Sequence, residues 1–201
     1  MVKRGLAMLL AAVLALGLAA CGSTDGENSG TAATTTTAEN TTEATTTEAP
    51  TTTTEAPADY TFEDGVFTVD QLRLSVPEDW VLASDAGVYM FTPADYPAHT
   101  DNLNIQVEPQ TEGFEEITQE YMESILTAVY PDLVFIGFEN GEKDGIPCIE
   151  MAYAASVGDV AMMAMQYLYN ADQLYTITYT IVGEELMADM EASSETIEIL
   201  E

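Results

Sequence analysis

A low-complexity segment between residues 22 and 58 limits which part of the chain can fold. The run TTEATTTEAPTTTTEAPA repeats a Thr-Thr-Glu-Ala unit and contains neither an aromatic residue nor an aliphatic side chain larger than alanine. Such a segment cannot bury enough apolar surface to offset the entropy of ordering it. We therefore predict a disordered linker, and we expect residues 59–201 to form one globular domain.

A short apolar stretch precedes the linker and ends at a cysteine. Lys3 and Arg4 are followed by an uncharged stretch that is rich in leucine and alanine and ends at Ala20. This stretch is shorter than the about 20 apolar residues that an ordinary transmembrane helix needs. A basic start, a short apolar stretch and small residues at its end are typical of a secretory signal peptide. We predict that residues 1–20 are this signal peptide.

The sequence LAAC at residues 18–21 resembles the lipobox of bacterial lipoproteins. The resemblance implies transfer of a diacylglyceryl group to the Cys21 thiol and cleavage between Ala20 and Cys21. Two acyl chains suffice for stable anchoring, because each buried CH₂ contributes about 0.8 kcal/mol. We expect the mature chain at the extracytoplasmic face of a cell membrane, on a Gram-positive surface in preference to a periplasm. Residues 21–58 would then act as a spacer. The alternative is a plain signal peptide with an incidental cysteine.

The charge of the domain is one-sided. Residues 59–201 contain 29 acidic residues against Arg73 and Lys143. Nucleic acids and anionic lipid headgroups are bound through Lys and Arg, so we expect the domain to bind neither. Cys148 has no partner for a disulfide within the domain, and we interpret it as a buried apolar residue. We expect a monomer that is held together by packing alone.

Apolar patterns predict an alternation of strands and helices. Strands are predicted over 65–69, 72–76, 88–92, 102–108, 133–138, 148–155, 160–169 and 174–181, and helices over 114–130 and 184–197. The 102–108 strand alternates apolar and polar residues, whereas 133–138 is apolar on both faces and is expected to be central. This order of elements predicts an α+β fold, with a single antiparallel sheet and helices packed on it.

Several stretches resemble the PsbP/DcrB-like α/β/α sandwich. They are LSVPEDWVL, VYMFTP, NLNIQVEP and the closing YTITYTI with its helix, and the resemblance spans nearly all of residues 60–200. Members of this superfamily include a photosystem accessory subunit, a nuclear-import factor that binds a small GTPase, and many bacterial lipoproteins. The resemblance therefore implies a binding or assembly protein in preference to an enzyme, and it carries over no catalytic motif.

Histidine chemistry has little support in the sequence. His99 is the only histidine, which excludes an HExxH zinc site. A Ser-His-Asp triad would have to combine His99 with Asp101, and no G-x-S-x-G elbow supports it. We interpret His99 as a solvated loop residue, and we expect neither a metal nor a cofactor.

The acidic stretch ENGEKDG invites a comparison with calcium loops. If Gly145 is the loop glycine of an EF-hand, then Asn140, Glu142 and Asp144 occupy the first three ligand positions, but the final bidentate position falls on Met151. The EF-hand interpretation fails on this spacing. We interpret the stretch as a polar hairpin turn, with a calcium site of another kind as the alternative.

Methionines and tyrosines gather in the strands over 160–169 and 174–181. Met163 and Met165 would lie on one face and Met162 on the other, so the three thioethers would not converge on copper. Four tyrosines would either pack across the strands or line a ligand groove, and we favour packing. They are Tyr167, Tyr169, Tyr175 and Tyr179.

Together these features predict a lipid-anchored cell-surface binding or accessory module without catalytic activity. The partner would be an envelope protein or a small ligand. One alternative is a carboxylate-based hydrolase of wall glycans, which requires two buried carboxyls facing each other at a separation of about 5–10 Å. Another is a passive or stress-related envelope protein, which predicts a smooth surface with no pocket and no exposed apolar patch.

Overall fold

The computed structural model describes residues 59–200. The predicted signal peptide over 1–20, the cleavage and lipidation site at Ala20 and Cys21, and the linker over 21–58 lie outside the described residues.

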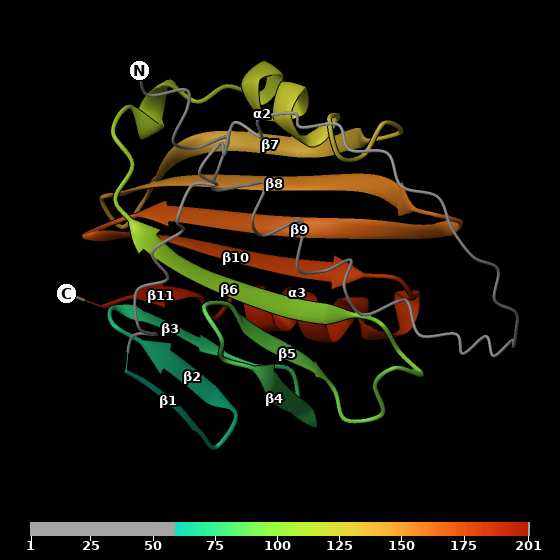
Figure 1. Ribbon diagram of the computed structural model, residues 1–201. Coiled ribbons are helices and arrows are strands. Elements are labelled where there is room, and N and C mark those ends of the chain that lie inside the picture. Colours follow the sequence, from blue (N-terminus) through green and yellow to red (C-terminus); the bar gives the residue numbers. More distant parts are fainter. Residues whose placement is uncertain (1–58, 201) are drawn as a thin grey trace, which may run out of the picture.

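The described residues form strands joined by short connections. The strands are β1 (Tyr60–Glu63), β2 (Val66–Val69), β3 (Leu72–Ser75), β4 (Trp80–Ser84), β5 (Tyr89–Pro93), β6 (Asn102–Pro109), β7 (Val134–Lys143), β8 (Ile146–Val157), β9 (Val160–Asn170), β10 (Gln173–Ile181) and β11 (Glu198–Ile199). They make a seven-stranded sheet of order β4-β5-β6-β10-β9-β8-β7 and a four-stranded sheet of order β1-β2-β3-β11. Every pair of neighbouring strands is antiparallel (Figure 1).

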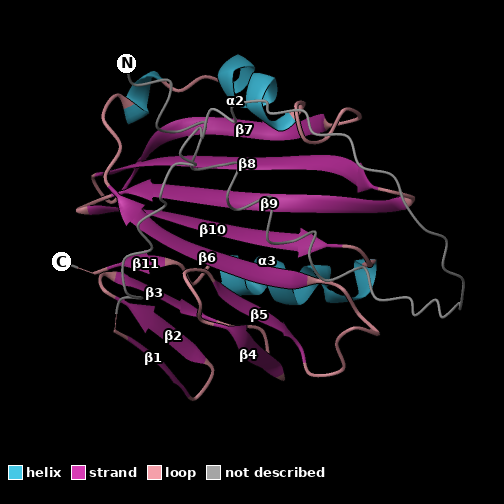
Figure 2. Ribbon diagram, viewed as in Figure 1, coloured by secondary structure: helices cyan, strands magenta, loops and turns pink. Residues whose placement is uncertain are grey.

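Two short helical segments cover the larger sheet. One comprises the 3₁₀ turn η1 (Phe114–Glu116) and α2 (Gln119–Leu126), and the other comprises the 3₁₀ turn η2 (Glu184–Leu186) and α3 (Met187–Ser194). Thr118 caps α2, since its hydroxyl accepts a hydrogen bond from the Tyr121 N–H at 3.3 Å. Figure 2 shows that these elements are the helical part of an otherwise sheet-based domain.

The seven-stranded sheet buries apolar side chains on both faces. On the face that we call the α3 face, Ile105, Ile177 and Tyr179 belong to one core with Met190 of α3 and Phe67 of the four-stranded sheet. On the opposite α2 face, a second core joins η1 and α2 to β8, β9 and β10. Its members include Phe114, Met122, Leu126, Ile149, Tyr153 and Leu168. The domain is therefore layered, with the larger sheet in the middle.

The predicted α+β class, an antiparallel sheet with packed helices, is confirmed by this arrangement. The structure differs from the prediction in the number of sheets, because β1, β2 and β3 pair with β11 and form a sheet of their own. The two predicted helices are also shorter than expected. The stretch 114–130 is interrupted at Ile117 and Thr118, whose backbones are extended, and α2 ends at Leu126.

The prediction that residues 133–138 form a central strand is wrong. They begin β7, which is the edge strand of the larger sheet. Phe135 and Phe138 pack into the α2-face core, whereas Val134 and Ile136 are 62% and 61% exposed. A bulge between Phe135 and Gly137 adds an extra residue to the strand. The run is apolar throughout because one set of its side chains is half-buried against the α2-face core and the other stands at the surface.

Candidate functional site

Part of the α3 face has no helix over it. Figure 1 shows α3 behind β10 and β6, while the upper strands β7 and β8 extend beyond it. On this part of the face lies a hollow of ≈ 410 Å³. We call it the β7 groove, and its lining residues are Gly137, Phe138, Glu139, Glu150, Met151, Ala152, Met165 and Tyr167.

The strand register explains the hollow. Gly137 of β7 pairs with Ala152 of β8, and Ala152 pairs with Met165 of β9. Two small residues therefore stand next to each other where a filled sheet face would carry large ones. A Cβ atom built on Gly137 would meet no heavy atom within 4 Å. The floor of the β7 groove is thus open and largely apolar.

The charged residues of the groove belong to the next set of residues that pair across the strands. Glu139 pairs directly with Glu150, and Glu150 pairs with Tyr167. Like charges directly opposite each other in an antiparallel pair destabilise it, so this pair costs the fold free energy. Glu150 is half-buried and Glu139 is exposed.

Tyr167 joins these paired residues to the end of α3. Burial raises the pKa of its phenol, the charges of Glu150, Glu191 and Glu195 raise the pKa further, and a hydrogen bond with Ser194 opposes this. The ring also lies edge-on to Tyr179 with centroids 6.1 Å apart. Carboxylates of β8 and of the C-terminal end of α3 therefore act on the same side of the groove.

No Lys or Arg lines the β7 groove. Within residues 59–200, Arg73 makes an ion pair with Glu198 at 3.6 Å. Lys143 donates a hydrogen bond to the Tyr169 hydroxyl at 3.4 Å, near the turn that ends β7. The groove consequently offers apolar surface and negative charge, without a cation of its own.

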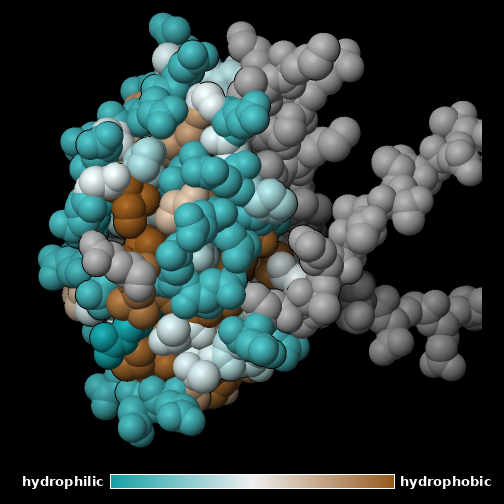
Figure 3. Space-filling view, turned by 90° about the vertical axis from the view of Figure 1, so that its left-hand side faces the viewer, coloured by the Kyte–Doolittle hydropathy of each residue, from teal (hydrophilic) through white to brown (hydrophobic). Residues whose placement is uncertain are grey.

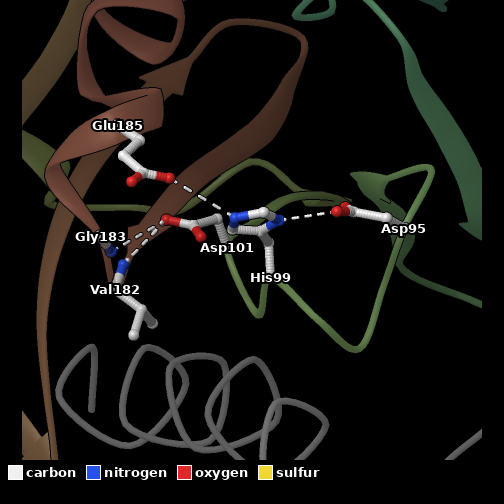
Figure 4. A network of polar contacts seen from close by, with 6 residues as sticks. All are labelled: Asp95, His99, Asp101, Val182, Gly183 and Glu185. Atoms are coloured by element: carbon white, nitrogen blue, oxygen red, sulfur yellow. Dashed lines mark hydrogen bonds and ion pairs between the residues drawn. The ribbon is translucent and has the colours of Figure 1, made fainter.

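His99 and Asp101 do not form a catalytic pair. His99 Nδ1 lies 2.8 Å from Asp95, and Nε2 lies 3.6 Å from Glu185. Asp101 is buried and accepts hydrogen bonds from the backbone N–H groups of Val182 at 2.9 Å and Gly183 at 3.4 Å. Figure 4 shows the two side chains engaged with different partners. The interpretation of His99 as an exposed loop residue is confirmed, with the addition of its two acidic neighbours.

The buried Asp101 and the half-buried Glu108 do not face each other. Asp101 is the one Asp or Glu of the described residues that is fully buried. Burial raises the pKa of Glu108 to about 7, against a hydrogen bond with Gln106. These two residues stand at opposite ends of β6. Seven residues of strand separate them by about 23 Å, well beyond the range for glycoside hydrolysis.

The residues proposed for a calcium loop belong to β7 and to the turn that joins it to β8. Asn140 donates hydrogen bonds to the carbonyl oxygens of Ile117 at 2.7 Å and Glu115 at 3.3 Å, and so ties β7 to η1. Glu142 lies in β7, and Asp144 lies in the turn to β8. Across residues 59–200, no three His, Cys, Asp or Glu side chains are grouped so that they could hold a metal ion. No helix in that range is long and apolar enough to cross a membrane.

The tyrosines, methionines and the cysteine divide between core and groove. Tyr169, Tyr175 and Tyr179 are buried in the α3-face core, as the packing interpretation predicts. Tyr167 is half-buried, packs against the same core and also lines the β7 groove. Two further predictions are confirmed. Cys148 is buried, and Met163 and Met165 lie on the face opposite to Met162.

The facing carboxylates were missed by the sequence analysis, although the sequence holds a signal for them. Asp144 and Gly145 have φ angles of 54° and 81°, as a two-residue type I′ hairpin turn requires. Such a turn fixes the register of the strands beside it, so that residues equally distant from it pair. Glu139 and Glu150 are equally distant from Asp144-Gly145, so recognition of the turn type predicts that they face each other.

Comparisons of the sequence give no relatives. No protein-family model matches the chain, and no curated protein matches it.

Solved structures do show similarity. The solution structure of cyanobacterial PsbP (CyanoP) from Synechocystis sp. PCC 6803 is 14% identical with a TM-score of 0.47, over 65% of this chain and 87% of that one. A protein of Bacteroides thetaiotaomicron VPI-5482 is 11% identical with a TM-score of 0.46, over 73% of this chain and 50% of that one. The protein PA94 of Pseudomonas aeruginosa, of unknown function, is 16% identical with a TM-score of 0.42, over 65% and 90%.

A PsbP structure is therefore among those similar to this chain. At these identities and TM-scores the similarity transfers no function and no site residue to the chain.

Proposed function

We propose that this chain is a binding or accessory module without catalytic activity, held at the extracytoplasmic face of the cell membrane by a lipid on Cys21. The lipobox-like LAAC at residues 18–21 supports the anchor, and the linker over 21–58 would hold the domain away from the membrane. The partner would be an envelope protein, and the domain itself would be monomeric.

The observation that carries the binding role is the β7 groove. An edge strand presents Val134 and Ile136 to solvent beside an open hollow with an apolar floor. Soluble proteins usually protect such edges, and apolar surface left exposed next to a hollow is characteristic of interaction sites. A passive envelope protein would need no such surface. A glycan hydrolase finds no support in the separated Asp101 and Glu108.

The anchor is tested with cysteine variants of the full chain. Cys21→Ala should move the protein from the detergent phase to the aqueous phase in a Triton X-114 partition of whole cells, because both acyl chains are lost. Cys148→Ala is the matched control and should stay in the detergent phase. Detergent-phase partition of the Cys21→Ala protein would contradict the anchor.

The binding role is tested by chemical cross-linking in intact cells, followed by affinity purification and mass spectrometry. The proposal expects one stoichiometric partner that is lost when Cys21→Ala mislocalises the bait. If no partner is enriched over the Cys21→Ala control, the binding role is wrong.

A further inference from the structure

The outer edge of β7 is available for strand pairing. In the part of the chain that the structure describes, β7 pairs with β8 alone and ends the sheet. It spans Val134–Lys143, so about half of its backbone N–H and C=O groups point away from β8. Edge strands of this length normally carry features that prevent further pairing. β7 has such features in the bulge between Phe135 and Gly137 and in its charged residues, but it also exposes Val134 and Ile136, whose apolar surface favours pairing.

The side chains beside this edge determine which residues an added strand would need. Residues two apart in a strand share a face, so an added strand would meet Gly137 and Glu139 with two of its own residues, also two apart. The first would stand over the apolar hollow formed by Gly137, Ala152 and Met165. The second would stand beside the Glu139–Glu150 pair.

Charge decides between the possible occupants. A second copy of this chain, paired through β7, would bring its own Glu139 and Glu142 to this edge with Lys143 as the one cation of that strand, so the added strand would itself be net negative. The chain as a whole has a net charge of −31. A segment with Lys or Arg at the second position would instead relieve the repulsion between Glu139 and Glu150. Electrostatic complementarity of this kind also speeds association.

We propose that the β7 groove binds an extended basic segment of another protein, which adds to the larger sheet as a strand beside β7. The segment carries an apolar residue over the hollow and a Lys or Arg two positions away, beside Glu139 and Glu150. Strand addition of this type takes its affinity from backbone hydrogen bonds and its specificity from alternate side chains. This inference rests on the proposed binding function and names the chemistry of its partner.

The first experiment uses the purified full chain and a synthetic peptide. The peptide is Thr-Val-Thr-Lys-Thr-Val-Thr-Lys-Thr with a fluorophore, and the control peptide has Glu in place of Lys. Anisotropy titrations at low salt should show saturable binding of the basic peptide, weakened in high salt because the charges are partly exposed. Absence of binding, or equal binding of the acidic peptide, would overturn the inference.

Two pairs of matched variants test whether the basic peptide binds at the β7 groove. Glu139→Gln should weaken binding of the basic peptide by about tenfold. Glu142→Gln is the same change at a position that pairs with Pro147, and it should leave the affinity unchanged. Gly137→Lys should abolish binding, because the lysine side chain fills the hollow. Gly141→Lys adds the same charge in the same strand, also where a Cβ meets nothing within 4 Å, and should still bind. Equal effects within either pair of variants would overturn the inference.

Two readouts test the mode of binding. Amides of Val134–Lys143 should exchange more slowly with D₂O when the peptide is bound, and protection confined to other strands would overturn strand addition. Sedimentation of the full chain alone should show a monomer. A dimer that Gly137→Lys dissociates would make a second copy the occupant and overturn the basic segment.

Cellular cross-linking separates this inference from the proposed function. A partner that Gly137→Lys fails to release would leave the binding module intact and refute the groove as its site. A partner whose contacting segment is acidic would refute the charge argument. Failure to cross-link any partner would refute the proposed function itself.

Discussion

Asp101 is a single side chain that holds two elements together. Its carboxylate lies just before β6 and accepts hydrogen bonds from Val182 and Gly183, which follow β10. Asp101→Ala should lower the free energy of unfolding by about 1.5–3 kcal/mol, since two amides lose a charged acceptor. Asp101→Asn keeps one acceptor oxygen and should lose less. Urea denaturation measures the free energy of unfolding of both variants, and equal stability of wild type and Asp101→Ala would contradict this role of Asp101 in joining the two elements.

His99 is a residue whose protonation should affect stability in a predictable direction. The hydrogen bond to Asp95 and the charge of Asp95, with smaller effects from Glu185 and Asp101, raise the pKa of His99 above 6.5. Because the folded pKa is raised, this contribution to stability is fully present below pH 6.5 and is lost as the pH rises through the folded pKa.

An NMR titration of the His99 ring measures this pKa directly. Asp95→Asn should bring the value back toward 6.5, because both the charge and the strongest acceptor are removed. A wild-type value at or below 6.5 would show that the ring does not interact with Asp95 in solution.

At the scale of the strand, the facing carboxylates Glu139 and Glu150 should lower the stability of the fold while they serve the proposed binding. Glu139→Gln removes one of two like charges that pair directly across the ladder. We expect a gain of roughly 0.2–1 kcal/mol in the free energy of unfolding at low salt, the range for cross-strand pairs. The gain should vanish at high salt, where the repulsion is screened. A loss of stability in this variant at low salt would mean that Glu139 is held by an attractive contact.

Strands with regular alternation were predictable, whereas their neighbours in the sheet were not. The predicted 102–108 and 174–181 agree with β6 and β10 to within a residue at each end, because apolar and polar residues alternate along both stretches of the sequence. The two-residue β11 has no pattern of its own and exists only because β3 offers it an edge. Similarly, the run 133–138 is apolar on both faces. A central strand and an edge strand with one exposed apolar face would both produce this pattern.

The helix boundaries and the candidate site were likewise not predictable from the apolar pattern. The apolar stripe from Phe114 continues past the point where the helix is broken, because Ile117 and Thr118 adopt extended backbone before α2. A pattern of apolar spacing does not record where the backbone leaves the helix. The groove depends on Gly137 standing next to Ala152, a pairing between residues that are remote in the pattern but fixed by the Asp144-Gly145 turn.

The charge of the whole molecule should govern its response to salt. The described surface is dominated by hydrophilic residues, with smaller hydrophobic areas between them, as Figure 3 shows for one side of the domain. With a net charge of −31, self-repulsion in the compact state exceeds that in the expanded chain. NaCl should therefore raise the Tm, by about 4 °C for each kcal/mol gained in a domain of this size.

A calorimetric series over NaCl concentration checks this expectation. The Glu139→Gln variant should show a smaller rise than wild type, because part of the repulsion is already removed. A Tm that is independent of NaCl, or that falls with it, would mean that the carboxylates are too far apart or too well solvated to repel one another.

The small sheet has a consequence for when the chain can fold. β3 is completed by β11, and the Ser75 N–H donates a hydrogen bond to the Thr196 hydroxyl, 121 residues further along. Synthesis proceeds from the N-terminus, so the β1–β3 meander is made long before its last partner exists. Phe67, Leu72 and Leu74 share one core with Met190 and Ile197, so this core stays incomplete until those two residues have been made. The four-stranded sheet and the core beneath it therefore become complete only after nearly all of residues 59–200 have been made.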